Sequence, residues 1–142
     1  MKKSKKKLNI RMMTVPVELH RYPSIDDYFD PVEGEKYIEF TTTIGDMGNT
    51  DYEFLVFMHA ITEQYLCWKH GVKDKDITEF DIKKDKEDPD AEPGNDPKAP
   101  YHKEHMVGND IEALLSVALG VDLPTYEAAI DKTLDKFSKK KK

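Results

Sequence analysis

His59 and Glu63 stand four residues apart in a segment, 51–70, that is otherwise largely apolar. Residues at this spacing lie one turn apart on the same face of a helix. An imidazole and a carboxylate placed in this way can bind Zn²⁺ or a similar divalent metal, or they can form a hydrogen-bonded polar pair within a core. With 5 His and 12 Glu in 142 residues, roughly 0.85 such pairs are expected by chance, so the spacing leaves both interpretations open.

A metal site of the catalytic type needs a third protein ligand and an open position for water. The best candidate for the third ligand is His105, which lies in a later predicted helix and would complete a set of two histidines and one carboxylate. Polar neighbours could support the ligands or act as a base. These neighbours are His102, Glu104, Asn109 and Glu112.

Further stretches carry a family resemblance. They are Gly45-Asp46, the run from Tyr52 to Val56, the pair His59 and Glu63, Glu92-Pro93-Gly94, Asp96-Pro97, Ala99-Pro100-Tyr101 and Glu104-His105. Together, over about residues 10–126, they resemble a family of small phage and prophage proteins that has no established activity. In that family the first helix tends to read His-Glu-x-x-Glu, which looks like the active-site helix of zinc-dependent peptidases. The resemblance implies a phage origin and a metal site, with zinc as the first candidate, but it implies no reaction.

The chain departs from that pattern at Ala60, where a zincin-type hydrolase keeps the Glu that deprotonates the metal-bound water. Two interpretations follow. Either Glu104 acts as the base from the second helix, or the site is structural and a metal ties the two helices together. We favour a structural or catalytically degenerate remnant of a metal-dependent hydrolase. The alternative is an acidic interaction module that docks onto a host or virion component without metal.

The elements that must position these residues follow from periodicity. Alternating apolar residues predict strands at 8–14 and 36–44 that pair with each other, and 22–28 predicts a turn with a short helix begun by Ser24. The predicted helices are 51–70 with a Thr50–Glu53 capping box and a left-handed cap at Gly71, a short one from Asp76, 101–119 closed by Gly120, and 124–137. The residues predicted to face the core are Phe54, Phe57, Ile61, Tyr65 and Trp68 in the first helix and Ile111, Leu114, Leu115, Ala118 and Leu119 in the third.

This order of elements predicts an α+β fold with a small antiparallel sheet of two or three strands, followed by three to four helices packed on one face. The layout agrees with a minimal zincin, although only by analogy of fold. We expect a single domain at 8–137, with basic disordered tails at 1–7 and 138–142. The polar, Pro- and Gly-containing stretch 83–99 predicts an exposed acidic loop.

Charge and composition limit the classes of partner. Nine of the 22 basic residues lie in the first seven and last four positions, so the rest of the chain carries 13 basic and 28 acidic residues. Such a body repels nucleic acid, which could then bind only through the lysine tails. The charge does not exclude a protein partner, whose identity the sequence leaves open. The single cysteine, Cys67, excludes an internal disulfide, and we find neither a signal-peptide core nor a membrane-length apolar run. These features predict a cytoplasmic protein, in the host cytoplasm if it is phage-encoded.

Overall fold

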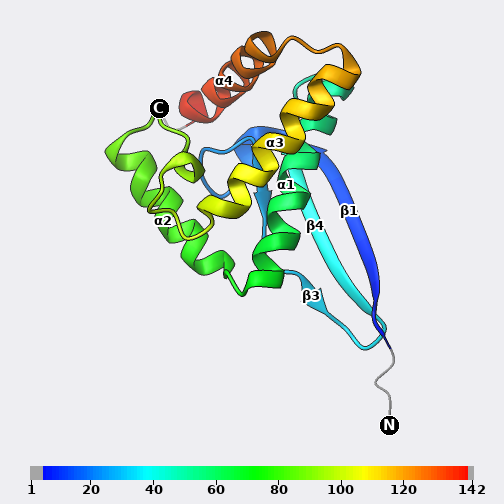
Figure 1. Cartoon of the computed structure of the whole chain (residues 1–142). Helices are drawn as coiled ribbons and strands as arrows, with labels where there is room; N and C mark the ends of the chain where they lie inside the picture. The colour runs from blue at the N-terminus through cyan, green and yellow to red at the C-terminus, as the bar shows by residue number, and fades with distance from the viewer. Residues whose placement is uncertain (1–4, 141–142) are drawn as a thin grey trace.

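A sheet and a group of helices on one of its faces make up the fold (Figure 1). The computed structural model describes residues 5–140, in which four strands precede four α-helices. The strands are β1 (Lys7–Val15), β2 (Asp26–Tyr28), β3 (Val32–Glu33) and β4 (Tyr37–Gly45). The α-helices are α1 (Thr50–His70), α2 (Asp74–Glu87), α3 (His102–Leu119) and α4 (Leu123–Lys140), and short 3-10 turns lie at Val17–Leu19 and Pro93–Asn95. The predicted α+β class is confirmed.

β4 is the central strand, and the strands on its two sides run in directions opposite to each other. β1 pairs with it in parallel, with Leu8 opposite Ile38, whereas β2 and β3 pair with it antiparallel. The two predicted strands therefore pair, but the prediction of a purely antiparallel sheet is wrong. The cause lies at 22–28, where the predicted helix begun by Ser24 is replaced by β2. This extra strand reverses the chain once more before β4 begins, so β1 and β4 point the same way.

α1 packs on β4 and contributes more buried apolar residues than any other element among the described residues. Phe40 and Ile44 of β4 are fully buried, and Ile44 clusters with Leu55, Ala60 and Tyr126. The helix is capped one residue earlier than predicted, because the side chain of Asn49 accepts a hydrogen bond from the backbone N–H of Tyr52 at 3.1 Å. The left-handed cap at Gly71 is confirmed, with φ of 75°.

The buried face of α1 is not the predicted aromatic one. Phe54 is 42% exposed, and the other predicted residues, Phe57, Ile61, Tyr65 and Trp68, are only partly buried. The helix instead buries the face that carries His59 and Glu63. The reason is that α1 lies between the sheet and α3, so its polar pair is covered by a second helix. In α3 the prediction also fails at Leu114, which is 68% exposed, and at Ala118 and Leu119, which are exposed as well.

The predicted boundaries of the tails and of the acidic loop also shift. α2 continues to Glu87, because Lys and Glu are good helix formers and Lys83 pairs with Glu87 one turn on at 4.0 Å. The loop therefore begins at residue 88, and it buries Gly94 and Ala99. Lys7 belongs to β1 and residues 138–140 to α4, while 1–4 and 141–142 lie outside the described residues. Between residues 5 and 140, no single helix combines the length and apolar character that crossing a membrane requires.

Candidate metal centre

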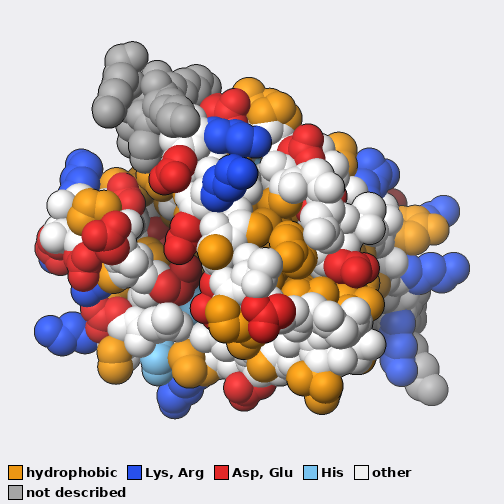
Figure 2. Space-filling view, turned by 90° about the horizontal axis from the view of Figure 1, so that it is seen from above, with side chains coloured by type: hydrophobic (Ala, Val, Ile, Leu, Met, Phe, Trp, Pro, Cys, Tyr) orange, Lys and Arg blue, Asp and Glu red, His pale blue; other side chains and the backbone are white. Residues whose placement is uncertain are grey.

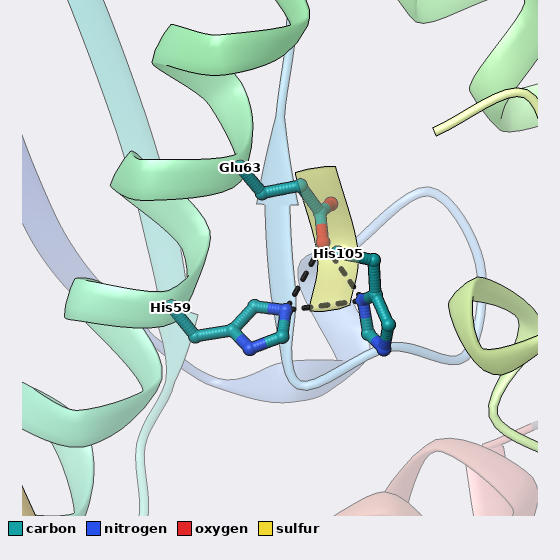
Figure 3. A group of neighbouring side chains, drawn as sticks. All are labelled: His59, Glu63 and His105. Atoms are coloured by element: carbon teal, nitrogen blue, oxygen red, sulfur yellow. Dashed lines mark hydrogen bonds and ion pairs between the residues drawn. The ribbon is translucent and has the colours of Figure 1, made fainter. Parts of the chain in front are cut away.

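The three predicted ligands meet between α1 and α3 (Figure 3). Nε2 of His59 lies 3.0 Å from Oε2 of Glu63, and Nδ1 of His105 lies 2.8 Å from the same oxygen. The two ring nitrogens are 3.1 Å apart. All three residues are buried, with exposed fractions of 8%, 5% and 3% respectively. The structure thus brings together, from segments 42 residues apart, one potential ligand atom from each side chain.

The spacing of these atoms can be compared with that of a zinc site. Zinc binds imidazole nitrogen at about 2.0–2.1 Å and carboxylate oxygen at about 2.0–2.2 Å, usually in a tetrahedron. Ligand atoms at the corners of such a tetrahedron lie about 3.3–3.4 Å apart. The observed edges of 2.8 to 3.1 Å need to widen only slightly. Two imidazoles and one carboxylate therefore fit a zinc-type ion in both chemistry and size.

His59 is held from its other side by α3. Its Nδ1 lies 2.5 Å from Oε1 of Glu112. This contact is an ion pair and lacks the alignment of a hydrogen bond, and among the described residues this nitrogen is the one buried side-chain polar atom without a hydrogen-bond partner. A carboxylate behind a metal-binding imidazole orients the ring and increases its basicity. Glu112 was among the predicted supporting residues, and the structure places it in that position.

His105 and Glu63 are supported in the same way. Nε2 of His105 donates to Oδ1 of Asn95 at 3.0 Å, and that oxygen also accepts from Nδ2 of Asn109 at 3.2 Å. The proton of His105 is thereby directed outward, and its Nδ1 faces the centre. Tyr28 donates its hydroxyl proton to Oε1 of Glu63 at 2.6 Å, which leaves Oε2 toward the histidines. Each potential ligand therefore has a separate outer partner, as metal ligands generally do.

The charges at the centre are strongly coupled. Burial alone would lower the pKa of His59, but the carboxylates of Glu112 and Glu63 outweigh it and raise that pKa to about 11. Burial alone would raise the pKa of Glu63, but the facing imidazoles of His105 and His59 lower it to about 2. Without a metal the pair is therefore an imidazolium and a carboxylate, and a metal ion would take the place of the proton between them.

Two glycines lie directly against the histidine rings. A Cβ at Gly108 would lie 2.9 Å from Nδ1 of His59, and a Cβ at Gly94 would lie 2.5 Å from Nδ1 of His105. Real Cβ atoms essentially never approach other heavy atoms below 3.0 Å. Only glycine therefore allows α3 and the loop before it to pack this closely on the rings. Nδ1 of His102 also donates to the carbonyl oxygen of Gly94 at 2.9 Å, which ties the loop to α3.

The two positions considered for a catalytic base, Glu104 and position 60, do not line the cavities beside the centre. The carboxylate of Glu104 accepts from Nδ1 of His70 at 3.0 Å, and Glu104 is not among the residues lining either cavity beside the centre. Ala60 is fully buried in the apolar cluster with Ile44 and Leu55. A Glu at position 60 would enter that cluster, so the zincin arrangement of the base does not transfer to this backbone.

Two cavities adjoin the centre, and both are lined by His59, His105, Asp26 and Glu92. The inner one has a volume of about 30 Å³, which is room for a water molecule. The outer one is a cleft of about 590 Å³ between α3, α4 and the loop before α3. Figure 2 shows the molecule from above, and acidic and apolar side chains are interspersed over the face that it draws. The centre is thus accessible from the cleft despite the burial of its ligands.

Several of these residues gave no recognisable signal in the sequence. Asp26 and Tyr28 belong to β2, a segment that predicted a helix, and Asn95 and Glu92 lie in a stretch that predicted a solvated loop. The one available hint was the stretch Glu92-Pro93-Gly94, which belongs to the family resemblance but stops short of Asn95. A glycine beside a polar residue in a loop is too common to identify a site.

Replacing Glu112 with Gln tests the support of His59. Glu112→Gln keeps the size of the side chain but removes the negative charge that faces Nδ1. We expect zinc affinity to fall about 10- to 100-fold with the fold retained. Competition with a chromophoric chelator measures the affinity. Glu127→Gln is the control, because Glu127 lines the same cleft from α4 without contacting a ligand. Equal affinities in the two variants would contradict this role of Glu112.

Comparison of the chain with models of known protein families, with curated proteins and with solved structures finds no match in any of the three. The resemblance to the phage protein family and to zincins therefore stays a prediction, and the function has to be argued from the geometry of the centre itself.

Proposed function

We propose that His59, Glu63 and His105 bind one divalent cation, zinc by the chemistry of the donors, and that the centre serves a hydrolytic reaction in the adjoining cleft. The observation that carries the proposal is the arrangement of three buried ligand atoms within 3.1 Å of one another, each of whose side chains contacts a separate outer partner. Such a pattern of inner and outer contacts is typical of metal sites. Hydrogen-bonded core histidines seldom need it.

The surroundings favour an open site over a closed one. Three protein ligands leave a fourth position, and the two cavities that meet at His59 and His105 provide space there. When bound, zinc supplies a Lewis acid and lowers the pKa of a water molecule to about 7. The cleft walls combine the apolar Ile25, Leu123 and Ile130 with carboxylates, so the chain itself can hold a ligand beside the centre.

A base is available at the boundary of the two cavities. Asp26 projects from β2 and lines both cavities together with His59 and His105. Burial, followed by the nearby charge of Glu63, raises the pKa of Asp26 well above its usual range. A higher pKa makes the ionised form of this side chain a stronger base, so that it could accept a proton from water. We therefore assign the role of base to Asp26, in place of the residue that zincins carry at position 60 and in place of Glu104.

The metal content of the purified protein tests the proposal. We expect one zinc ion per chain by elemental analysis, or on titration of the chelated protein with zinc. His59→Ala and His105→Ala should lose it, because each leaves only two protein ligands. His70→Ala is the matched control, since the side chain of His70 is 54% exposed and pairs with Glu104 outside the centre. If the parent neither retains nor binds stoichiometric zinc, the proposal fails, and the acidic interaction module becomes the better one.

The same ligands could instead serve a structural site that ties α1 to α3, an interpretation favoured by their burial. Cobalt distinguishes the two. If the fourth position is open, the visible spectrum of the Co²⁺-loaded protein should change when azide or acetohydroxamate is added. A spectrum that is insensitive to both would indicate a closed, structural site.

A further inference from the structure

The sheet ends at a long apolar edge strand that the helices leave uncovered. β1 is nine residues long, and among residues 5–140 it pairs only with β4. Leu8, Ile10 and Met12 point to the same side of the sheet as the buried Phe40, yet they are 52%, 45% and 38% exposed. In Figure 1, β1 runs along the margin of the molecule beyond α1. Proteins normally shield such an edge, because its free backbone groups and apolar side chains invite another strand.

The backbone of β1 shows which groups are free. Lys7 donates its N–H to the carbonyl of Lys36, and the carbonyl of Val15 accepts from Asp46. The odd-numbered residues of β1 are thus the ones that bond toward β4. Because bonding alternates along a strand, the N–H and C=O groups of Leu8, Ile10, Met12 and Thr14 point to the free edge. Three of the four exposed apolar residues of β1, namely Leu8, Ile10 and Met12, therefore also carry free backbone groups; the fourth, Met13, lies on the opposite face.

We propose that two copies of this chain pair through β1, antiparallel, with Ile10 on the two-fold axis. In this register Leu8 of one copy faces Met12 of the other, and Ile10 faces its own counterpart. Leu8, Ile10 and Met12 of the two strands then form one continuous apolar row on the α1 side. Because the groups that face the partner are those of Leu8, Ile10 and Met12, each of these pairs is also a hydrogen-bonded pair.

Charge selects this register over its neighbours. With the two-fold axis at Ile10, Arg11 of one copy lies opposite Asn9 of the other, and Lys7 lies opposite Met13. No two cations then face each other. With the axis at Asn9, Lys7 of one copy would face Arg11 of the other. Centred on Arg11, the two guanidinium groups would face each other, which destabilises a strand pair.

The favoured register also offers each Arg11 a partner. Asn9 sits beside Glu39 of β4, to which it donates a hydrogen bond at 3.4 Å. The order across the outer face would be Glu39, then Asn9, then the Arg11 of the second copy. The guanidinium would lie two strand steps, or about 10 Å of backbone separation, from an acidic side chain, a distance that the long arginine side chain can bridge, and the same arrangement would occur twice by symmetry.

The helices of the two copies would cover the new apolar row. A two-fold axis perpendicular to the sheet places both α1 helices on the same side, each over its own β4. From one β4 to the other are three strand steps, or about 14 Å. Helices in direct contact lie about 8–10 Å apart, so the gap is one that six apolar side chains can fill. A sheet edge that is open in one chain becomes the centre of a continuous sheet in two.

Measurement of mass in solution tests this pairing. We expect sedimentation equilibrium of the full chain at about 100 μM to give a dimer. Ile10→Lys should give a monomer with an unchanged circular dichroism spectrum, because the side chain is 45% exposed within one chain. Leu114→Lys is the control: it places the same charge on an exposed apolar site of α3 and should leave the dimer intact. A monomeric parent would overturn the proposal, and so would a dimer that survives Ile10→Lys.

Cross-linking tests the register independently. Directly opposed, hydrogen-bonded residues have Cα atoms about 5.5 Å apart, within the range that a disulfide spans. Ile10→Cys should therefore form a disulfide-linked dimer on mild oxidation. Met12→Cys should not, because its two copies would be separated by several residues along the strands. Cys67 is 2% exposed and should not interfere. Cross-linking of Met12→Cys in preference to Ile10→Cys would contradict the register.

Discussion

Saturation with zinc should raise the melting temperature of the protein by about 10 °C over the chelated form. A ligand that binds only the folded state at 1,000 times its Kd stabilises it by about 4 kcal/mol. For a chain of this length each kcal/mol shifts the melting temperature by about 3 °C. The condition that only the folded state binds is met because folding alone brings His59 of α1 and His105 of α3 together. Differential scanning calorimetry with excess zinc and with chelator measures it.

Two histidine variants make this thermal shift specific. In His105→Ala the shift should disappear, because the ligand from α3 is gone. In His70→Ala it should persist at full size, since His70 lies at the end of α1 and pairs with Glu104. A shift that survives in His105→Ala would mean that zinc binds elsewhere, for example to the carboxylates of the cleft.

Gly108→Ala should weaken zinc binding at least tenfold and destabilise the protein by about 1–3 kcal/mol. Helix propensity alone predicts that this substitution stabilises the protein, since alanine is favoured over glycine inside a helix by about 1 kcal/mol. The steric overlap should outweigh this gain, because the new Cβ would lie 2.9 Å from Nδ1 of His59. That ring is held between Glu63 and Glu112 and cannot move without losing one of them. Overpacking of this kind costs about 1–3 kcal/mol.

Gly94→Ala should also weaken zinc binding and destabilise the protein, because a Cβ at position 94 would overlap the ring of His105. Gly34→Ala is the control, because its Cβ would meet only the carbonyl oxygen of Tyr37 at 3.5 Å, an ordinary contact. Urea unfolding and zinc titration of the three variants measure both effects. A more stable Gly108→Ala variant with unchanged zinc affinity would show that propensity wins and that the ring has room to move.

The fold was predictable wherever a local pattern decides the structure. α1 and α3 end at the glycines expected to close them, with φ of 75° at Gly71 and 69° at Gly120. The parallel pairing of β1 with β4 was not predictable, because it depends on β2, whose three residues are too few for a periodic signal. The buried face of α1 was also mispredicted. Its inward side carries the polar His59 and Glu63, which a pattern of apolar residues cannot reveal.

The three residues of the centre were predictable, but the side chains around them were predictable only in part. His59 and Glu63 share one helix, so their spacing alone predicts that they are neighbours. His105 could be proposed because few histidines are available. Tyr28 and Asn95 could not, since their positions depend on how a short strand and a loop pack against α1 and α3. Contacts of this kind are set by the tertiary structure, and no local rule contains them.

The close approach of Gly108 to the ring of His59 has an evolutionary consequence. His105, Gly108 and Glu112 form the pattern His-x-x-Gly-x-x-x-Glu on α3, and about 0.02 such triplets are expected by chance at this composition. In descendants that keep the centre, the three positions should be retained as a group, together with Gly94. In a lineage that has lost either histidine, the glycine facing it is released from selection and should be free to regain a side chain. The glycines would then record whether a distant relative still has the proposed metal site.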